Sequence, residues 1–201
     1  MTPEEWATDR LAFRRFTPDD VDLLVELDAD PAVMRYLSGG SSTPPQVVRS
    51  VILPRVLSSY DAGAGFGVWA AVERSSGTFV GWISLTTAGD PGAKEARLGF
   101  RLRRAAWGKG YATEGASALV RRGFTTLGLE RITASTYEHN RASRRVMEKV
   151  GMRLVHQFRP TPEALRQHAM VDPAAFTDVW EGDEVVYAIE RDAWARGSRQ
   201  A

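Results

Sequence analysis

Residues 98–114, LGFRLRRAAWGKGYATE, place a short strand, a glycine-bearing turn and the start of a helix in immediate succession. Leu98, Phe100 and Leu102 alternate with other residues, which is the period of a strand with one buried face. A helix N-terminus presents unpaired N–H groups and the positive end of the helix dipole, and glycines let that backbone approach an anion closely. The stretch therefore predicts a phosphate-binding turn between a strand and a helix.

The same stretch is rich in basic residues. Between positions 96 and 110 no acid occurs, and the basic side chains are those of Arg97, Arg101, Arg103, Arg104 and Lys109. We expect this cluster to form a local site for an anion. The formal net charge of the whole chain is only +1, which is too small to indicate nonspecific binding of nucleic acid, so we expect no nucleic-acid partner.

Two common phosphate-binding loops do not match the letters of this turn. A Walker P-loop requires Gly-x-x-x-x-Gly-Lys followed by Ser or Thr, but Arg103 stands at the first glycine position and Gly110 follows Lys109. A dinucleotide-binding fingerprint requires a third small residue after two spaced glycines, and Thr113 stands there instead. The turn therefore belongs to neither class.

The remaining chain alternates irregularly between strand and helix patterns. Aromatic and β-branched runs predict strands over 11–16, 66–72, 79–85, 96–102, 131–136, 153–158 and 185–189, with the second and third joined as a hairpin. Apolar periodicity with start and stop signals predicts helices over 17–27, 46–60, 111–126 and 140–150, the second carrying Pro54 as a local defect. We expect one α/β (α+β) domain over 1–201, with a mixed sheet, a core from about 11 to 194 and a tail over 195–201.

Composition excludes several kinds of site. The chain has no cysteine, which removes disulfides, thiolate metal ligands and cysteine nucleophiles. His139, His156 and His168 do not have the i, i+4 spacing of a helical zinc site, so we expect no metal. No apolar run approaches the roughly 20 residues of a membrane span, and the first residues lack the basic start and apolar stretch of a secretory signal. We expect a cytoplasmic protein without a membrane partner.

The glycine turn resembles the acetyl-CoA signature of the GNAT (GCN5-related N-acetyltransferase) superfamily, in which Arg or Gln precedes x-x-Gly-x-Gly or Ala. Gly110 and Ala112 take the small positions, and Trp107 stands where the superfamily usually has Arg or Gln. The run WGKGYATE is typical of the RimJ/RimL-like branch of that superfamily. The letters at 140–152 and 184–189 are similar to further segments of that branch, so the resemblance spans about 11 to 194.

The resemblance implies a GNAT-like mixed, twisted β-sheet flanked by helices on both faces and splayed at a bulge near Gly99. The pantetheine arm of acetyl-CoA would lie in the split like an extra strand, and Asn140 would bond the arm from the other side. The residues implied to contact this co-substrate are Phe100, Arg101, Leu102, Trp107, Gly108, Lys109, Gly110, Tyr111, Ala112, Thr113, Asn140 and Ser143. The implied activity is transfer of the acetyl group to a primary amine by direct attack on the thioester.

Catalytic residues are marked less clearly. Many superfamily members have Tyr seven residues after the helix-opening Asn, but Met147 stands there and cannot donate a proton. The RimL-like branch offers a hydroxyl at Ser143, which we expect to stabilise the departing thiolate. Related sequences often have Glu on the central strand, where this chain has Arg97. The general base is left open among surface acids, with Glu138 as the named candidate beside Glu95, Asp183 and Glu184.

The acceptor amine is open at this level. It could belong to a protein N-terminus, a polyamine, a sugar, or an antibiotic or toxin. A small-molecule acceptor would leave the segment 159–183 folded over the cleft, with Phe176 and Trp180 lining a pocket, whereas a protein acceptor would need an open groove. The alternative function is a non-catalytic module that binds acetyl-CoA for sensing or assembly. Proteins of this type often form homodimers, and the sequence leaves that state open.

Overall fold

The structure is a computed structural model that describes residues 5–63, 65–88, 92, 94–161 and 182–197. The strands are β1 (Trp6–Ala7), β2 (Leu11–Arg15), β3 (Gly67–Glu73), β4 (Phe79–Thr87), β5 (Glu95–Leu102), β6 (Arg131–Tyr137), β7 (Arg153–Phe158) and β8 (Glu184–Glu190). The α-helices are α1 (Val21–Ala29), α2 (Pro31–Ser38), α3 (Pro45–Val47), α4 (Leu53–Ser58), α5 (Tyr111–Thr125), α6 (Arg141–Lys149) and α8 (Arg191–Gly197). Short 3-10 segments are η1 (Pro18–Asp20), η3 (Ser59–Ala62) and η4 (Arg104–Ala106), and η2 (Val48–Ile52) is a π-helical turn.

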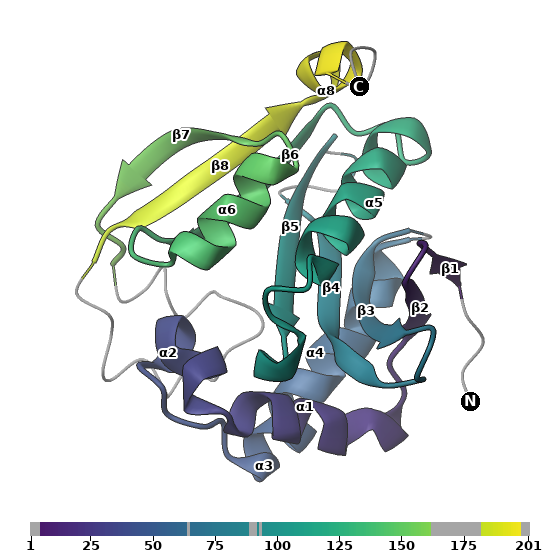
Figure 1. Cartoon of the computed structure of the whole chain (residues 1–201), viewed down its shortest axis with the longest axis vertical. Helices are drawn as coiled ribbons and strands as arrows, with labels where there is room; N and C mark the ends of the chain where they lie inside the picture. The colour runs from purple at the N-terminus through teal and green to yellow at the C-terminus, as the bar shows by residue number, and fades with distance from the viewer. Residues whose placement is uncertain (1–4, 64, 89–91, 93, 162–181, 198–201) are drawn as a thin grey trace.

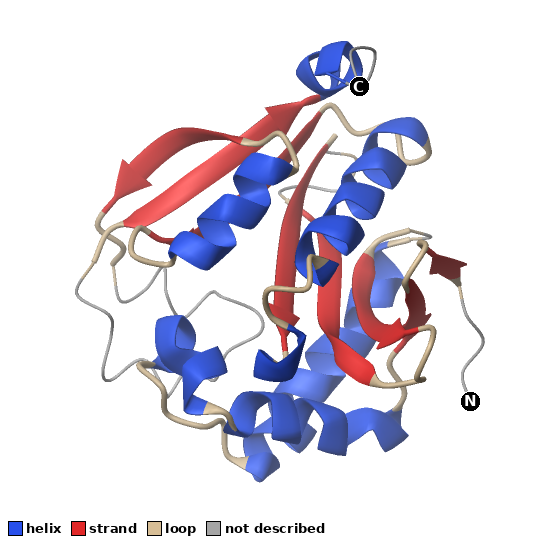
Figure 2. Cartoon of the chain, viewed as in Figure 1, coloured by secondary structure: helices blue, strands red, loops and turns tan. Residues whose placement is uncertain are grey.

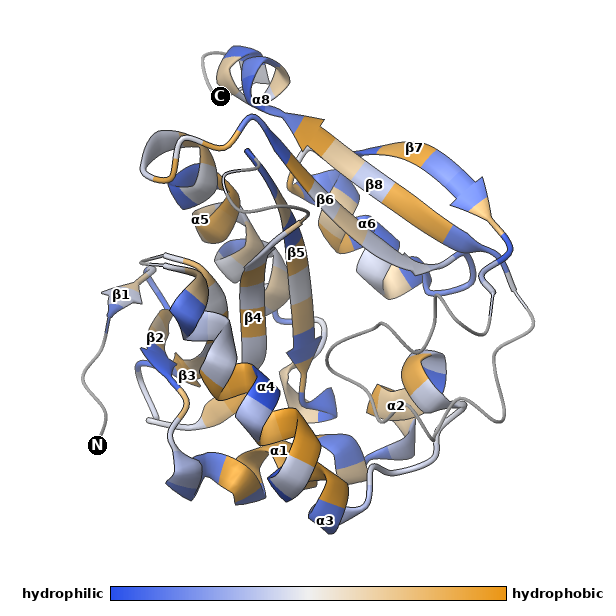
Figure 3. Cartoon of the chain, turned by 180° about the vertical axis from the view of Figure 1, so that it is seen from behind, coloured by the Kyte–Doolittle hydropathy of each residue, from blue (hydrophilic) through white to orange (hydrophobic). Residues whose placement is uncertain are grey.

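One eight-stranded sheet runs through the described residues in the order β1-β2-β3-β4-β5-β6-β8-β7 (Figure 1). Its neighbouring strands are antiparallel except β5 and β6, which are parallel. Helices α5 and α6 cover one face, and α1 and α4 cover the other (Figures 2 and 3). The predicted α/β class, the mixed sheet and the helices on both faces are therefore confirmed.

The sheet splits between its two parallel strands. The register of β5 with β6 ends at Arg97 and Thr133, although β5 continues beside β4 and β6 continues beside β8. The predicted splay near Gly99 is therefore present. The predicted bulge at Gly99 is wrong, because the β4–β5 register is continuous there and the shift lies between β3 and β4, near Val80. Strands β5 and β6 therefore diverge without an extra residue in β5.

Two apolar layers hold the sheet between the helices. On one face Leu98 of β5 and Ile132 of β6 pack with Leu119 and Phe124 of α5. On the other face a second cluster joins β3 and β4 to α1, η2 and α4, and it contains Phe16, Leu24, Leu27, Val48, Ile52, Leu53, Val56, Val68, Ala70, Phe79 and Trp82. Figure 3 shows apolar residues, in orange, along α1 and α4. Burial on both faces fixes the sheet as the rigid support of the split.

The predicted helix over 46–60 forms as consecutive short segments. The N–H of Leu53 donates to the carbonyl of Val48, five residues earlier, which makes a π turn immediately before Pro54. Pro54 has no N–H and cannot continue a regular ladder, so the expected defect is accommodated by this wider turn.

Two α-helices and one strand lie outside the predicted set. Helix α2 begins at Pro31 after an Asp30 cap and ends at Gly39 in the left-handed region. Strand β1 places Trp6 against Phe13, with ring centroids 3.7 Å apart, so the sheet begins before the predicted core boundary at 11. Helix α8 extends to Gly197, past the predicted boundary at 194. No helix in the described part of the chain is long and apolar enough to cross a bilayer.

Candidate active site

The free edge of β5 forms one wall of the split. The carbonyl of Glu95 accepts from Ala88, and the N–H of Arg103 donates to Val80, so odd-numbered residues of β5 turn their backbone groups toward β4. In an antiparallel pair these groups alternate in direction along the strand. The backbone groups of Phe100 and Leu102 therefore face the split, where β6 has moved away. This is the edge along which an extended arm can pair.

The predicted phosphate turn lies at the end of this edge. Gly108 and Gly110 have φ values of 74° and 84°, in the left-handed region that favours glycine. Among the described residues, no acceptor is found for the N–H groups of 108–110, and the first N–H groups of α5 have no intrahelical partner. A Cβ built at Gly108 would meet nothing within 4 Å. A row of N–H donors at a helix start, with open space beside it, suits a diphosphate.

Three of the five basic residues in the predicted anion cluster are paired with acids. Arg101 is buried and pairs with Asp28 of α1, the two side chains being 5% and 2% exposed. Arg103 pairs with Glu26 at 2.6 Å, and Arg104 pairs with Asp30 at 3.2 Å. The backbone groups of Arg101 face β4 and not the split. The guanidinium groups hold α1 and the turn after it against the end of β5, so the Arg101 side chain is engaged by Asp28 and does not face the cofactor site.

Other side chains of the predicted cofactor loop turn back onto the protein. Trp107 donates from Nε1 to the carbonyl of Leu102 at 2.8 Å, although 46% of the residue is exposed. Tyr111 is buried, and its hydroxyl donates to Glu73. That bond raises the pKa of Tyr111. The exposed side chain of Lys109 and the backbone groups therefore remain as polar surface of this loop.

Helix α6 begins on the other side of the split. Because β5 and β6 are parallel and each leads into a helix, α5 and α6 begin at the same end of the sheet, where these strands diverge (Figure 1). Asn140 caps α6 by accepting from the N–H of Ser143 at 3.2 Å and donates to Thr136 at 3.0 Å. Ser143 is half-buried, one turn before Met147, which is fully buried as predicted. The Ser143 hydroxyl thus lies on the sheet-facing side of the helix start.

The candidate base Glu138 lies on the far side of β6 from β5. Its carboxylate accepts from Gln157 of β7 and from the N–H of Asp183, each at 3.3 Å, and lies 3.4 Å from His139. Arg144 donates to the Glu138 carbonyl at 2.9 Å, which fixes the turn into α6. Glu138 stays a prediction.

Glu184 differs from the surface acid that the sequence predicts. It is 7% exposed and opposite Tyr137 in the β6–β8 ladder. Burial, and then the charge of Glu184, raise the pKa of Tyr137. Burial of this acid could not be read from its position at the start of a short strand.

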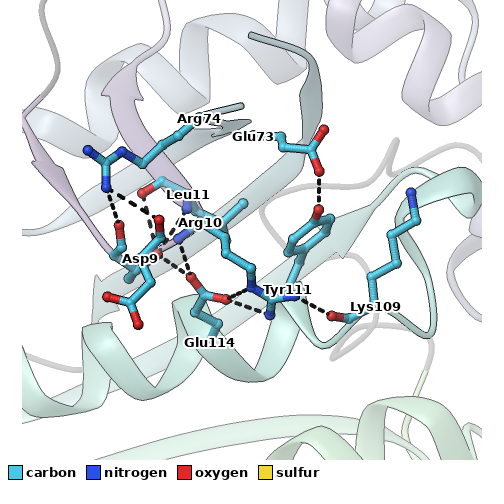
Figure 4. Close-up of polar contacts among 9 residues, drawn as sticks. Asp9, Arg10, Leu11, Glu73, Arg74, Lys109, Tyr111 and Glu114 are labelled. Carbon is cyan, nitrogen blue, oxygen red and sulfur yellow. Dashed lines mark hydrogen bonds and ion pairs between the residues drawn. The ribbon is translucent and has the colours of Figure 1, made fainter. Parts of the chain in front are cut away.

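A polar network that sequence reasoning missed holds the phosphate turn from behind (Figure 4). Arg10, in the turn between β1 and β2, donates from Nη1 to the carbonyl of Lys109 at 2.9 Å and from Nε to Glu114 at 2.6 Å. Glu114 also accepts from the hydroxyl of Thr8 at 2.6 Å. Burial opposes ionisation of Glu114, but the bonds from Thr8 and Arg10 together hold its pKa below the usual range. Positions 8 and 10 carry no sequence signal for this contact, which spans about half the chain.

A depression of about 600 Å³ lies between the segment 6–9 and α5, and none of the predicted cofactor residues lines it. Phe176 and Trp180, which were predicted to line an acceptor pocket, lie outside the described residues. Within those residues, no group of three or more His, Asp or Glu side chains is placed to hold a metal ion.

The mixed sheet is split between two parallel strands, and two helices begin at the open end of the split. This arrangement defines a class of transferase that can hold an extended cofactor arm and its diphosphate. The chain belongs to the acetyltransferase (GNAT) domain family, whose family model matches residues 10–153. It is an N-acetyltransferase, as the sequence predicts.

Relatives and solved structures agree with this assignment. The chain is 32% identical over 182 residues to FsC-acetyl coenzyme A-N(2)-transacetylase of Aspergillus fumigatus, with 87% of this chain and 71% of that protein covered. A GNAT acetyltransferase from Bacillus anthracis superposes with a TM-score of 0.70 at 26% identity, covering 92% and 98% of the two chains. The RimL ribosomal L7/L12 alpha-N-protein acetyltransferase, solved with coenzyme A, has a TM-score of 0.71 at 18% identity, over 95% and 99%, and shows likeness of fold alone.

Proposed function

We propose that this chain moves the acetyl group of acetyl-CoA to a primary amine within the split, and that it is a RimJ/RimL-like member of its family. The observation that carries the proposal is the free edge of β5 ending at a row of unpaired N–H groups at the start of α5. The names of the Aspergillus relative and of the RimL protein both describe acetyl transfer to nitrogen. An amine acceptor follows from that shared chemistry.

The residues present fit acetyl-CoA. The backbone groups of Phe100 and Leu102 would pair with the amides of the pantetheine arm, although the Leu102 carbonyl already accepts from Trp107. The N–H groups of 108–113 would hold the diphosphate. Asn140 keeps one amide hydrogen beyond its bond to Thr136, and that hydrogen would reach the arm from the α6 side. Acetyl-CoA supplies the activated acyl group as a thioester.

The acceptor nitrogen must be neutral before it can attack. An α-amine has a pKa of about 7.7 to 8.0 and a lysine amine about 10.4, so lysine requires roughly 3 kcal/mol more for deprotonation near neutral pH. The central strand offers Arg97 where relatives often have a carboxylate, and Glu138 is engaged by β7 and Asp183. A site without a strong general base favours an amine of low pKa, such as a peptide α-amine, over lysine.

Ser143 is the residue we assign to the departing thiolate. A thiol has a pKa of about 8.5, far below that of a serine hydroxyl, so Ser143 would donate a hydrogen bond and would not transfer its proton outright. Within the described residues the Ser143 hydroxyl has no hydrogen-bond partner, while its backbone N–H is held by Asn140. The hydroxyl is thus available while the backbone behind it is fixed.

The first test is binding followed by turnover. Calorimetry with coenzyme A and acetyl-CoA should give saturable binding, and a panel of α-amines, polyamines and amino sugars should release free thiol with the accepted class. No binding at millimolar coenzyme A would overturn the proposal. Binding without thiol release across the panel would favour the non-catalytic, acetyl-CoA-sensing alternative.

The second test replaces Ser143 by alanine. We expect Ser143→Ala to lower kcat roughly 10²-fold and to leave the Kd for acetyl-CoA unchanged, because the bond to the thiolate forms only as the thioester breaks. Steady-state kinetics and calorimetry measure the two quantities. Ser117→Ala, an exposed serine of α5, is the matched control and should match the wild type. An unchanged kcat in Ser143→Ala removes the residue from the mechanism.

A further inference from the structure

Arg10 reaches the phosphate turn from a distant part of the chain. It lies in the turn between β1 and β2, where the N–H of Thr8 donates to the carbonyl of Leu11 at 2.8 Å. From there its guanidinium extends to the carbonyl of Lys109, and it lies over the ring of Tyr111 with 4.8 Å to the centroid. Figure 4 shows this side chain crossing from the N-terminal turn to the start of α5.

Glu114 fixes the Arg10 side chain on its other edge. One carboxylate oxygen of Glu114 accepts from Nε at 2.6 Å, and the other accepts from the backbone N–H of Arg10 at 2.9 Å and from Thr8. The guanidinium therefore cannot rotate without losing several bonds at once. Because Glu114 neutralises its charge locally, Arg10 serves as a fixed donor to the loop and contributes little net attraction for an anion.

The bond to Lys109 determines the direction of the next N–H group. A trans peptide is planar, so the C=O of Lys109 and the N–H of Gly110 point in opposite directions. Arg10 binds the C=O, which turns the N–H of Gly110 away from Arg10. A Cβ at Gly110 would lie 3.3 Å from Nη2 of Arg10, so the guanidinium packs directly against this peptide.

We infer that Arg10, held by Glu114, is a positioning residue that sets the Lys109–Gly110 peptide so that the Gly110 N–H faces the diphosphate of coenzyme A. This inference rests on the proposed function and assigns it a residue outside the glycine turn. The effect is specific to the diphosphate, because among the described residues the Arg10 side chain bonds Lys109 and Glu114, and neither belongs to the free edge of β5 or to the start of α6.

The experiment compares two acetyl donors. In Arg10→Ala, the Kd for coenzyme A and the KM for acetyl-CoA should rise about tenfold, the size expected for one lost hydrogen bond to a charged group, with kcat retained. With S-acetylpantetheine, which lacks the diphosphate, kcat/KM should equal that of the wild type. Glu114→Gln should have a weaker effect in the same direction, and Arg10→Lys should restore part of the affinity.

Arg74→Ala provides the matched control. Arg74 holds the same N-terminal turn by donating to the carbonyls of Thr8 and Asp9 at 3.1 and 3.3 Å, and no bond from it to the glycine turn is found within the described part of the chain. It should therefore leave both donors unaffected. In the amide NMR spectrum, Arg10→Ala should shift the Gly110 signal in the free protein, and Arg74→Ala should not.

The outcomes separate this inference from the proposed function. If wild-type protein does not bind coenzyme A, the proposed function fails. If the wild type binds and Arg10→Ala binds equally well, or loses activity equally with both donors, Arg10 does not position the diphosphate site and the inference is overturned.

Discussion

Single side chains at the residue scale join segments that are remote in sequence. The hydroxyl of Tyr60 accepts from the N–H of Phe16 at 2.8 Å and donates to the carbonyl of Val68 at 2.6 Å. It thereby links the end of β2, the start of β3 and the segment after α4. Burial, the largest influence, raises the pKa of Tyr60 to about 12, whereas the bond from Phe16 acts in the opposite direction.

The Tyr60 hydroxyl predicts a pH dependence of stability. Its folded pKa of about 12 exceeds the unfolded value of about 10, so the neutral phenol is favoured by folding. Its contribution is fully present below about pH 10 and is lost as the pH rises through about 12. Tyr60→Phe should lower the free energy of unfolding at pH 8 by about 1 to 3 kcal/mol and should flatten its decline between these pH values.

Urea unfolding from pH 8 to 12 measures both effects. Tyr36→Phe, which removes an exposed hydroxyl that bonds the carbonyl of His139, is the control and should keep the wild-type slope above pH 10. An unchanged slope in Tyr60→Phe would show that other groups cause the alkaline loss of stability.

At the element scale, α1 attaches to the sheet through ion pairs of unequal burial. Asp28 and Arg101 are buried, and Asp28 also accepts from Thr43 at 3.0 Å. The Glu26 side chain, by contrast, is 66% exposed where it pairs with Arg103. A buried pair is costly to break because the remaining charge has no water, whereas an exposed pair contributes little.

Asp28→Ala should therefore lower the free energy of unfolding by about 3 to 5 kcal/mol and the Tm by roughly 10 °C. Glu26→Ala, on the same helix, should cost no more than about 1 kcal/mol. Calorimetric melting compares the two variants. The double replacement Asp28→Leu with Arg101→Met should recover most of the loss, and if it does not, the helix is held by more than this pair.

The whole molecule consists of two parts of one sheet that meet at a short junction. Only the pairs Glu95–Arg131, Ala96–Ile132 and Arg97–Thr133 join β5 to β6 in the described ladder. Beyond them the two strands leave free backbone groups, and an extended ligand would complete the sheet between them. Binding of coenzyme A should therefore protect the backbone N–H groups of this edge from hydrogen exchange.

Amide hydrogen exchange with coenzyme A tests that expectation. The N–H groups of Phe100 and Leu102 should exchange about tenfold slower or more when the ligand is bound, since each gains an acceptor. Gly99 and Arg101, which face β4, are internal controls and should not change. Adenosine 3′,5′-bisphosphate, which lacks the arm, should protect none of the four. Equal protection of all four would indicate general stiffening and would place the arm elsewhere.

The homodimer and the cytoplasmic location remain predictions.

Local patterns along the chain determined most elements, because periodicity, caps and glycine stops act over a few residues. The strand, turn and helix over 98–125, the cap at Asn140 and the buried Met147 could all be predicted in this way. Helix α2 has such signals too, in Asp30, Pro31 and Gly39, although it is not among the predicted helices.

Tertiary structure alone decided which charges remain available to a ligand. The arginines beside the glycine turn look like an anion site in the sequence, yet acids of α1 and the following turn bind three of them. Arg10 shapes the turn from a position about 100 residues away. A contact between residues remote in sequence, such as Arg10 and Lys109, depends on their distance in the folded chain, and their linear spacing carries no information about it.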